Sequence, residues 1–173
     1  MSAIVIREID AAEAARRIGE LGAILVDAVA NGASVNFLAG FTQGEAEDFW
    51  RGQLPGLGDG SRHLIVADDG SRLVGTVMLT LAPQPNQPHR ADVGKMLVLS
   101  SQRRQGLGRR LLDAVETLAR AQGRTLLMLD TTSGSAGDLL YRNGGWTEYG
   151  VVPGHALSTD GVPSNTTFFY KRV

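Results

Sequence analysis

The middle of the chain holds three β-type segments in succession, with no helical segment between them. They cover residues 61–69, 72–81 and 89–99, and Asp69-Gly70 between the first two is a hairpin turn signal. Successive strands with short connections pair antiparallel, because a parallel pair needs a crossover of about a dozen residues or more. The predicted antiparallel meander is the strongest constraint on the fold.

Helical and β-type segments flank the meander on both sides. Before it come a strand over 3–9 and helices over 10–31 and 43–54, the second stopping before Pro55. After it come a helix over 106–122, a strand over 125–129, a helix over 135–142 and strands over 146–152 and 166–171, with a loop from Pro153 to Gly161 between the last two. This order predicts a mixed α/β (α+β) fold with a mostly antiparallel sheet.

The composition suits one domain over residues 1–173, with 43% hydrophobic residues to build its core. The chain has no cysteine, which excludes a disulfide scaffold, a thiolate zinc site and a cysteine nucleophile. His63, His89 and His155 lack ligand spacing, so no metal is expected. The net charge of -1 argues against broad nucleic-acid or membrane binding. With no visible signal peptide or membrane span, we expect a cytoplasmic protein without those partners.

One stretch, Ser100–Arg110, carries a candidate anion site, because a strand here runs into a glycine-containing loop that opens a helix. Four arginines crowd the helix start: Arg103, Arg104, Arg109 and Arg110. A helix N-terminus prefers acids, and none appears before Asp113. Backbone N–H groups around Gly106 and Gly108 can approach a phosphate closely. A bound diphosphate would balance this charge, and a solvated basic helix start is the alternative.

Two other nucleotide-binding motifs compete for this loop. The P-loop needs Gly-Lys-Ser/Thr, where this chain has Gly-Leu-Gly-Arg. The dinucleotide fingerprint needs a third glycine where Leu111 stands, although Asp130 ends the next strand at about the distance of a ribose-binding acid. That fingerprint also belongs at the start of a βαβ unit, whereas this loop follows consecutive strands. A nicotinamide-binding protein is therefore the second interpretation.

On these residues the chain resembles the GNAT superfamily of N-acetyltransferases. The run Arg103-Arg104-Gln105-Gly106-Leu107-Gly108 matches its loop signature, and Tyr141 with Gly145-Trp146 resembles its later motif, where phenylalanine is the usual aromatic residue. Arg90-Ala91-Asp92-Val93 and Leu129-Asp130-Thr131 resemble the tabtoxin-resistance branch. The resemblance implies six to seven strands flanked by about four helices, with central strands that splay apart.

The resemblance also implies acetyl-CoA as co-substrate. In this family the strand before the loop pairs through its backbone with the pantetheine arm, and N–H groups of the loop hold the pyrophosphate. Carried over residue by residue, the implied cofactor-binding set is Met96, Leu97, Val98, Arg103, Arg104, Gln105, Gly106, Leu107, Gly108, Arg109, Thr131 and Ser135.

Three further residues receive catalytic roles from the resemblance. Tyr141 is the candidate acid for the leaving thiolate; the alternative is a core tyrosine with a buried partner. Asp130 and Asp92 are candidate bases, directly or through water, since an attacking amine must lose a proton. The relatives have glutamate in place of Asp92. The alternatives are a turn residue for Asp130 and an exposed strand residue for Asp92. Residues 34–37 occupy a place where the family lines its acceptor pocket.

The predicted function is N-acetyl transfer to a primary amine of a small molecule, by direct attack in a ternary complex. A tabtoxinine-like or amino-acid-like acceptor, in resistance or detoxification, is the leading specific hypothesis. A peptide or protein amine, a non-catalytic acyl-CoA-binding module and a dinucleotide-binding module are the alternatives. A homodimer is one of the oligomeric states that the sequence leaves open.

Overall fold

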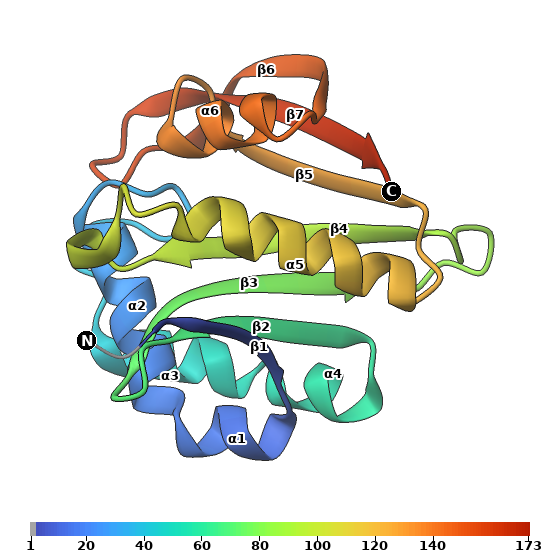
Figure 1. The fold of residues 1–173 in the computed structure, drawn as a ribbon. Helices are drawn as coiled ribbons and strands as arrows, with labels where there is room; N and C mark the ends of the chain where they lie inside the picture. The colour runs from blue at the N-terminus through green and yellow to red at the C-terminus, as the bar shows by residue number, and fades with distance from the viewer. Residues whose placement is uncertain (1–2) are drawn as a thin grey trace.

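The computed structural model describes residues 3–173, which form one seven-stranded sheet with helices on both faces (Figure 1). The strand order is β1-β2-β3-β4-β5-β7-β6. The strands are β1 Val5–Ile9, β2 Arg62–Asp68, β3 Leu73–Leu81, β4 Arg90–Val98, β5 Leu126–Thr132, β6 Thr147–Leu157 and β7 Pro163–Arg172. The predicted mixed, mostly antiparallel sheet is confirmed, because only the β4–β5 pair is parallel in the described residues.

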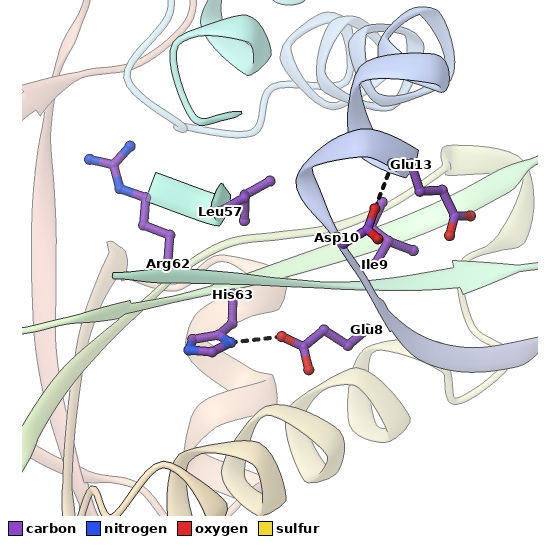
Figure 2. Close-up of a pocket in the computed structure, with 7 residues that line it drawn as sticks. All are labelled: Glu8, Ile9, Asp10, Glu13, Leu57, Arg62 and His63. Atoms are coloured by element: carbon purple, nitrogen blue, oxygen red, sulfur yellow. Dashed lines mark hydrogen bonds and ion pairs between the residues drawn. The ribbon is translucent and has the colours of Figure 1, made fainter. Parts of the chain in front are cut away.

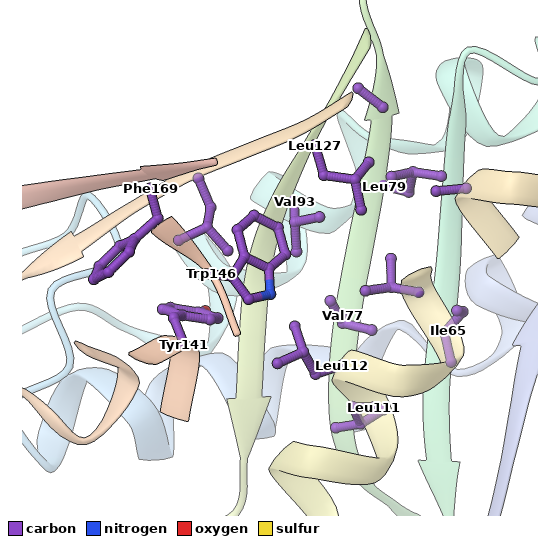
Figure 3. Packing of buried hydrophobic residues seen from close by; sticks show 14 of the residues in the cluster. Ile65, Val77, Leu79, Val93, Leu111, Leu112, Leu127, Tyr141, Trp146 and Phe169 are labelled. Carbon is purple, nitrogen blue, oxygen red and sulfur yellow. The ribbon is translucent and has the colours of Figure 1, made fainter. Parts of the chain in front are cut away.

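The helices divide between the two faces of the sheet. They are α1 Ala11–Arg16, α2 Ile18–Ala30, α3 Gln43–Arg51, α4 Leu54–Asp59, α5 Leu107–Ala121 and α6 Ala136–Asn143. One core lies between the sheet and α5 and also includes Tyr141 of α6; Figure 3 shows part of its packing. A second core lies on the opposite face, against α1, α2 and α3. Two six-residue helices, α1 and α4, account for the excess over the four helices expected.

The predicted helix over 10–31 is wrong in one respect, because it breaks at Arg17. The backbone of Arg17 leaves helical geometry there (φ -105°, ψ 20°), ending α1 and starting α2. Its guanidinium group binds Glu20 at 2.8 Å and Asp68 of β2 at 2.6 Å. The second predicted helix stops at Arg51, and Pro55 lies in the first turn of α4, where proline is well tolerated.

The last two strands are longer than predicted. We expected a loop from Pro153 to Gly161, but β6 continues to Leu157 and β7 starts at Pro163. The pairing shifts register between Val152 and Ala156, so an irregularity in the ladder accommodates Pro153-Gly154. The remaining turn contains Asp160-Gly161, as the sequence indicated.

The centre of the sheet opens where β4 leaves β5. The two strands pair over only three positions, ending with Asp92 opposite Met128, although β4 continues to Val98 and β5 to Thr132. Figure 1 shows β5 diverging from β4 beyond this point. We call the diverging segments, 93–98 of β4 and 129–132 of β5, the splay. The splayed central strands implied by the sequence resemblance are thus confirmed.

Strand β4 changes the direction of its side chains inside the splay. Gly94 pairs with Met78 of β3 and Leu97 pairs with Thr76, so β4 holds one extra residue at Lys95–Met96. Such a bulge reverses the alternation of side chains. Val93 packs in the α5 core, whereas Leu97 packs in the core on the α2 side.

Within residues 3–173, no helix is both long enough and apolar enough to cross a bilayer.

Candidate active site

Two carboxylates lie where the splay begins. Asp92 is the last residue of β4 to pair with β5, and Asp130 lies two residues beyond its partner Met128. Their neighbours Ala91, Val93 and Leu129 pack in the α5 core, so strand alternation places both aspartates on the α2 side. The structure therefore brings together the two acids that the sequence analysis singled out.

The surroundings of Asp92 favour its protonated form. Burial raises the pKa of Asp92, and the negative charge of Asp130 raises it further, while Arg90 opposes both effects. The Arg90 guanidinium lies 3.5 Å from the Asp92 carboxylate, which is too long for a strong ion pair. A carboxylate with a raised pKa is a better proton acceptor at neutral pH than an ordinary one.

Tyr141 of α6 lies on the other face of the sheet. The residue is 6% exposed, and its ring centre lies 5.9 Å from that of Trp146 and 6.0 Å from that of Phe169 (Figure 3). No hydrogen bond of its hydroxyl is found within residues 3–173. Burial, with a further contribution from Asp130, raises the pKa of Tyr141 well above its ordinary value. The phenol therefore stays protonated, and its hydroxyl can donate.

The loop before α5 presents unpaired backbone donors. Arg104 (φ 61°) and Gly106 (φ 75°) adopt left-handed backbone conformations, and Gly106 precedes the first residue of α5 without a side-chain cap. Among residues 3–173, no carbonyl or side chain accepts from the six consecutive N–H groups of residues 104–109. Unpaired N–H groups at a helix N-terminus bind anions, so this loop fits a diphosphate.

Three of the four loop arginines have partners within the chain. Arg109 binds Asp113 one turn later at 2.8 Å, and Arg110 donates to the carbonyl of Ile4 at 2.7 Å. Arg103 folds back and donates to the carbonyl of Val98 at 3.2 Å. Within the described part of the chain, Arg104 has no such partner. The anion site therefore rests mainly on the backbone N–H groups, with Arg104 the most available side chain.

The start of the loop is anchored by a residue that the sequence analysis missed. Asp27 of α2 accepts from the backbone N–H and the hydroxyl of Ser100, each at 2.7 Å. The two residues lie 73 positions apart, so no local pattern could pair them. At the other end of the loop, the side chain of Leu107 is buried in the core beneath α5. The loop is thus held at both ends.

The remaining predicted cofactor contacts lie on the two strands of the splay. Met96 and Val98 point to the α5 side and Leu97 to the α2 side, while the β4 edge from 93 to 98 has no partner strand on its β5 side in the described residues. That edge can pair with an extended ligand. The Thr131 hydroxyl lies 3.2 Å from that of Ser135, which caps α6 by accepting from the N–H of Asp138. Both hydroxyls therefore already position α6. The side chain of Gln105 contacts Gln102 at 3.3 Å and points into no core.

Lys95, in the bulge, is the second residue that the sequence analysis missed. Its ammonium lies 5.1 Å from the ring centre of Phe49 and donates to the carbonyl of Val35 at 3.4 Å. Burial lowers the pKa of Lys95, while the charge of Asp130 acts in the opposite direction. Glycine inside a strand is a signal for a bulge, so Gly94 could have drawn attention to this residue.

A separate pocket on the molecule contains none of the residues assigned to cofactor binding or catalysis. It lies beside β1, β2 and the short helices α1 and α4, and Figure 2 shows its lining: Glu8, Ile9, Asp10, Glu13, Leu57, Arg62 and His63. Its polar groups are largely satisfied internally, with His63 Nδ1 2.7 Å from Glu8 and Asp10 accepting from the N–H of Glu13 at 2.7 Å. In residues 3–173, no group of three or more acidic or histidine side chains could hold a metal ion.

Comparison with known proteins decides the family. The model of the acetyltransferase (GNAT) family matches residues 26–138, which is most of the chain. The chain belongs to the GNAT acetyltransferase family. The enzyme is therefore an N-acetyltransferase of the type that uses acetyl-CoA, and a nicotinamide-binding function is not favoured.

Solved structures share the whole fold of this GNAT enzyme. Ribosomal-protein-alanine N-acetyltransferase from Brucella melitensis is 22% identical, with 98% of this chain and 99% of that chain covered and a TM-score of 0.76. A Salmonella typhimurium protein described as an acetyltransferase, solved with its cofactor acetyl-CoA, is 18% identical (99% and 94% covered, TM-score 0.76). A protein described as a phosphinothricin N-acetyltransferase is 20% identical (99% and 99% covered, TM-score 0.77).

Proposed function

We propose that this enzyme transfers the acetyl group of acetyl-CoA to a primary amine of a small molecule, by direct attack in a ternary complex. The observation that carries the proposal is the pair of features at the splay. Six unpaired N–H groups at residues 104–109 fit the diphosphate of the donor, and two carboxylates lie on the α2 side of the same opening. No cysteine is present to form an acyl-enzyme.

The donor contributes a thioester, whose carbonyl carbon reacts with an amine once the amine has lost its proton. An alkyl amine has a pKa of about 10 and is mostly protonated at neutral pH, so a base must act first. We assign this role to Asp92, acting through a water molecule, because its raised pKa suits it better than exposed Asp130. Asp130 supplies negative charge that attracts the cationic amine to the opening.

Tyr141 is the proposed acid for the leaving thiolate. Its hydroxyl is protonated and has no hydrogen-bond partner among the described residues. The backbone of 96–98 and the N–H groups from Arg104 to Arg109 hold the donor in this arrangement. Thr131 and Ser135 lie at the α6 end of the same opening, next to the tyrosine helix.

For the acceptor we propose a tabtoxinine-like or amino-acid-like amine, in a resistance or detoxification role. The similarity to a protein described as a phosphinothricin N-acetyltransferase supports this choice. The ribosomal-protein-alanine N-acetyltransferase has comparable similarity, so a protein amine is the second candidate. We also propose a cytoplasmic location, while the homodimer stays a prediction for light scattering.

The test is a panel of amines with detection of the free thiol released as CoA. The panel contains amino acids, β-lactam-like amines, polyamines and peptides with free N-termini. We expect release with small amines, and release only with peptides would replace the proposed acceptor class. Acetyl-CoA should raise the melting temperature and NADH should not, because a ligand that binds only the native state stabilises it. Stabilisation without thiol release from any amine would favour a non-catalytic acyl-CoA-binding module.

A further inference from the structure

Lys95 places one ammonium group beside a cluster of aromatic rings on the α2 side of the splay. Its Nζ lies 5.1 Å from the ring centre of Phe49 and 6.0 Å from that of Phe37, and Phe37 stacks on Phe41 at 4.0 Å. In residues 3–173, its only hydrogen bond is the long one to the carbonyl of Val35, and no carboxylate lies within ion-pairing distance.

An ammonium in such surroundings lacks the partner that buried lysines normally have. Lys95 is half-buried, and the faces of aromatic rings compensate only part of the hydration that its ammonium has lost. Burial lowers the pKa of Lys95, which is the expected sign for a cation without a close counter-ion. Asp130 is near enough to act on Lys95 through its charge but makes no ion pair with it, so the ammonium can still take a carboxylate as a direct partner.

The backbone of Lys95 adopts a conformation that is unfavourable for a residue with a side chain. Lys95 has a φ of 48°, in the left-handed region that a residue with a side chain rarely adopts. The hydroxyl of Thr76, which is fully buried, donates to the Lys95 carbonyl at 2.8 Å and so holds the bulge. Strained backbone that the surrounding structure maintains is typical of functional sites.

The loop after α2, which is distant from Lys95 in the sequence, lies against the Lys95 ammonium. Val35 and Phe37 belong to the loop after α2, where Asn36 has a φ of 76°. The N–H of Ala39 in this loop donates to the carbonyl of Thr159, in the turn between β6 and β7, at 2.7 Å. The loop that carries Val35 and Phe37 is thus held against the turn between β6 and β7.

The charges along β4 are complementary to a molecule with an amine at one end and a carboxylate at the other. Asp92 and its neighbour Asp130 lie where the amine must lose its proton, and Lys95 lies three residues further along β4. We propose that Lys95 binds a carboxylate of the acceptor, so that the substrate is a compound with both a primary amine and a carboxylate. This inference rests on the proposed function, and it makes Lys95 the residue that selects acids over neutral amines.

The test compares each acid with its own neutral amide. The twenty common L-amino acids, β-alanine and 4-aminobutyrate are assayed beside their carboxamides, with kcat and KM measured for those that release CoA. We expect the wild type to prefer acids. In Lys95→Met the ratio of kcat/KM for acid over amide should fall by about 10- to 100-fold, mostly through KM, because a charged hydrogen bond is lost. Lys95→Arg should keep the ratio well above that of Lys95→Met.

The outcomes separate this inference from the proposed function. Lys95→Met keeps the strained backbone occupied by a side chain of similar length, so a purely structural role would weaken acids and amides equally and overturn the inference. Wild-type preference for amides would overturn it while leaving the acetyltransferase function intact. If no compound releases CoA, the proposed function fails. The ammonium resonance of Lys95 in the acetyl-CoA complex then decides the inference, because an unchanged signal on adding the acids contradicts it.

Discussion

The two sides of the splay are built in different ways. The proposed donor side is one continuous segment, residues 100–109, and its proposed functional groups are backbone N–H donors. The proposed acceptor side combines side chains from three separate segments: Asp92 and Lys95 of β4, Asp130 of β5 and Phe37 of the loop after α2. Backbone donors bind any diphosphate of the right shape, whereas the side chains can be exchanged one at a time. The donor side is therefore suited to a constant ligand and the acceptor side to a variable one.

The largest effect is expected for Tyr141, the proposed acid, which should matter for every combination of donor and acceptor. Tyr141→Phe should lower kcat by about 100-fold or more, because a general acid contributes at least that factor. Affinity for acetyl-CoA, measured by calorimetry, should stay within about twofold, since the hydroxyl makes no hydrogen bond within residues 3–173 that its removal would break. The loss should be equal for every acceptor. Unchanged turnover would remove Tyr141 from the acid role, and a loss confined to some acceptors would move it to the acceptor side.

A smaller effect should be confined to the donor side. Gly108→Asp places a carboxylate in the first turn of α5, where the added Cβ meets only the end of the Leu140 side chain, at 3.3 Å. Acetyl-CoA should bind about 10- to 100-fold more weakly because of charge repulsion, measured by calorimetry. The melting temperature without ligand should rise slightly, since an acid suits a helix N-terminus.

Gly108→Asn is the matched neutral control for this variant. It has the same shape without the charge, and it should retain most of the affinity. Equal losses in both variants would mean that space at Gly108, rather than anion binding, explains the effect.

The smallest effect should be confined to the acceptor side and visible in the pH profile. Asp92 must be deprotonated to accept a proton, so kcat/KM falls as pH drops through its raised pKa. Asp130→Asn removes a charge that raises the pKa of Asp92, so the acidic limb should move to lower pH. The plateau value of kcat/KM should fall by roughly 3- to 10-fold, because the cationic amine is attracted less strongly.

Asp92→Asn should instead abolish this acidic limb, with a larger loss of rate. If Asp130→Asn abolishes the limb and Asp92→Asn leaves it in place, the base is Asp130. Acetyl-CoA affinity serves as the control in both variants, because neither carboxylate lies in the donor loop.

The contrast between the two sides also explains what the sequence could predict. The meander, α5 and β5 follow from local periodicity, and the donor loop follows from glycine and arginine spacing within one short stretch. Asp92, Asp130 and Tyr141 were named through family resemblance, and their catalytic roles stay predictions. Lys95 was missed because its orientation depends on pairing with β3, which no local pattern contains.

Two of the three remaining errors have the same physical origin. Arg17 interrupts a helix because it binds Asp68, which lies 51 residues away. Asp27 of α2 holds the start of the donor loop at Ser100, which lies 73 residues further along the chain. Pro55 was interpreted only as a stop signal, although the same residue type favours the first turn of a new helix. Contacts between distant segments override local preference at each of these positions except the last.

The extra residue in β4 makes the length of this strand critical. Deleting one residue between Gly94 and Leu97 would restore simple alternation opposite Val77 of β3, and Leu97 and Val98 would keep their present faces. The ammonium, however, would be lost or directed into the core beneath α5. The connection from 82 to 89 has no such restriction, because turns there do not set the phase of β4 beyond its first pairs. Insertions and deletions should therefore be tolerated in the connection from 82 to 89, whereas within β4 they should abolish activity.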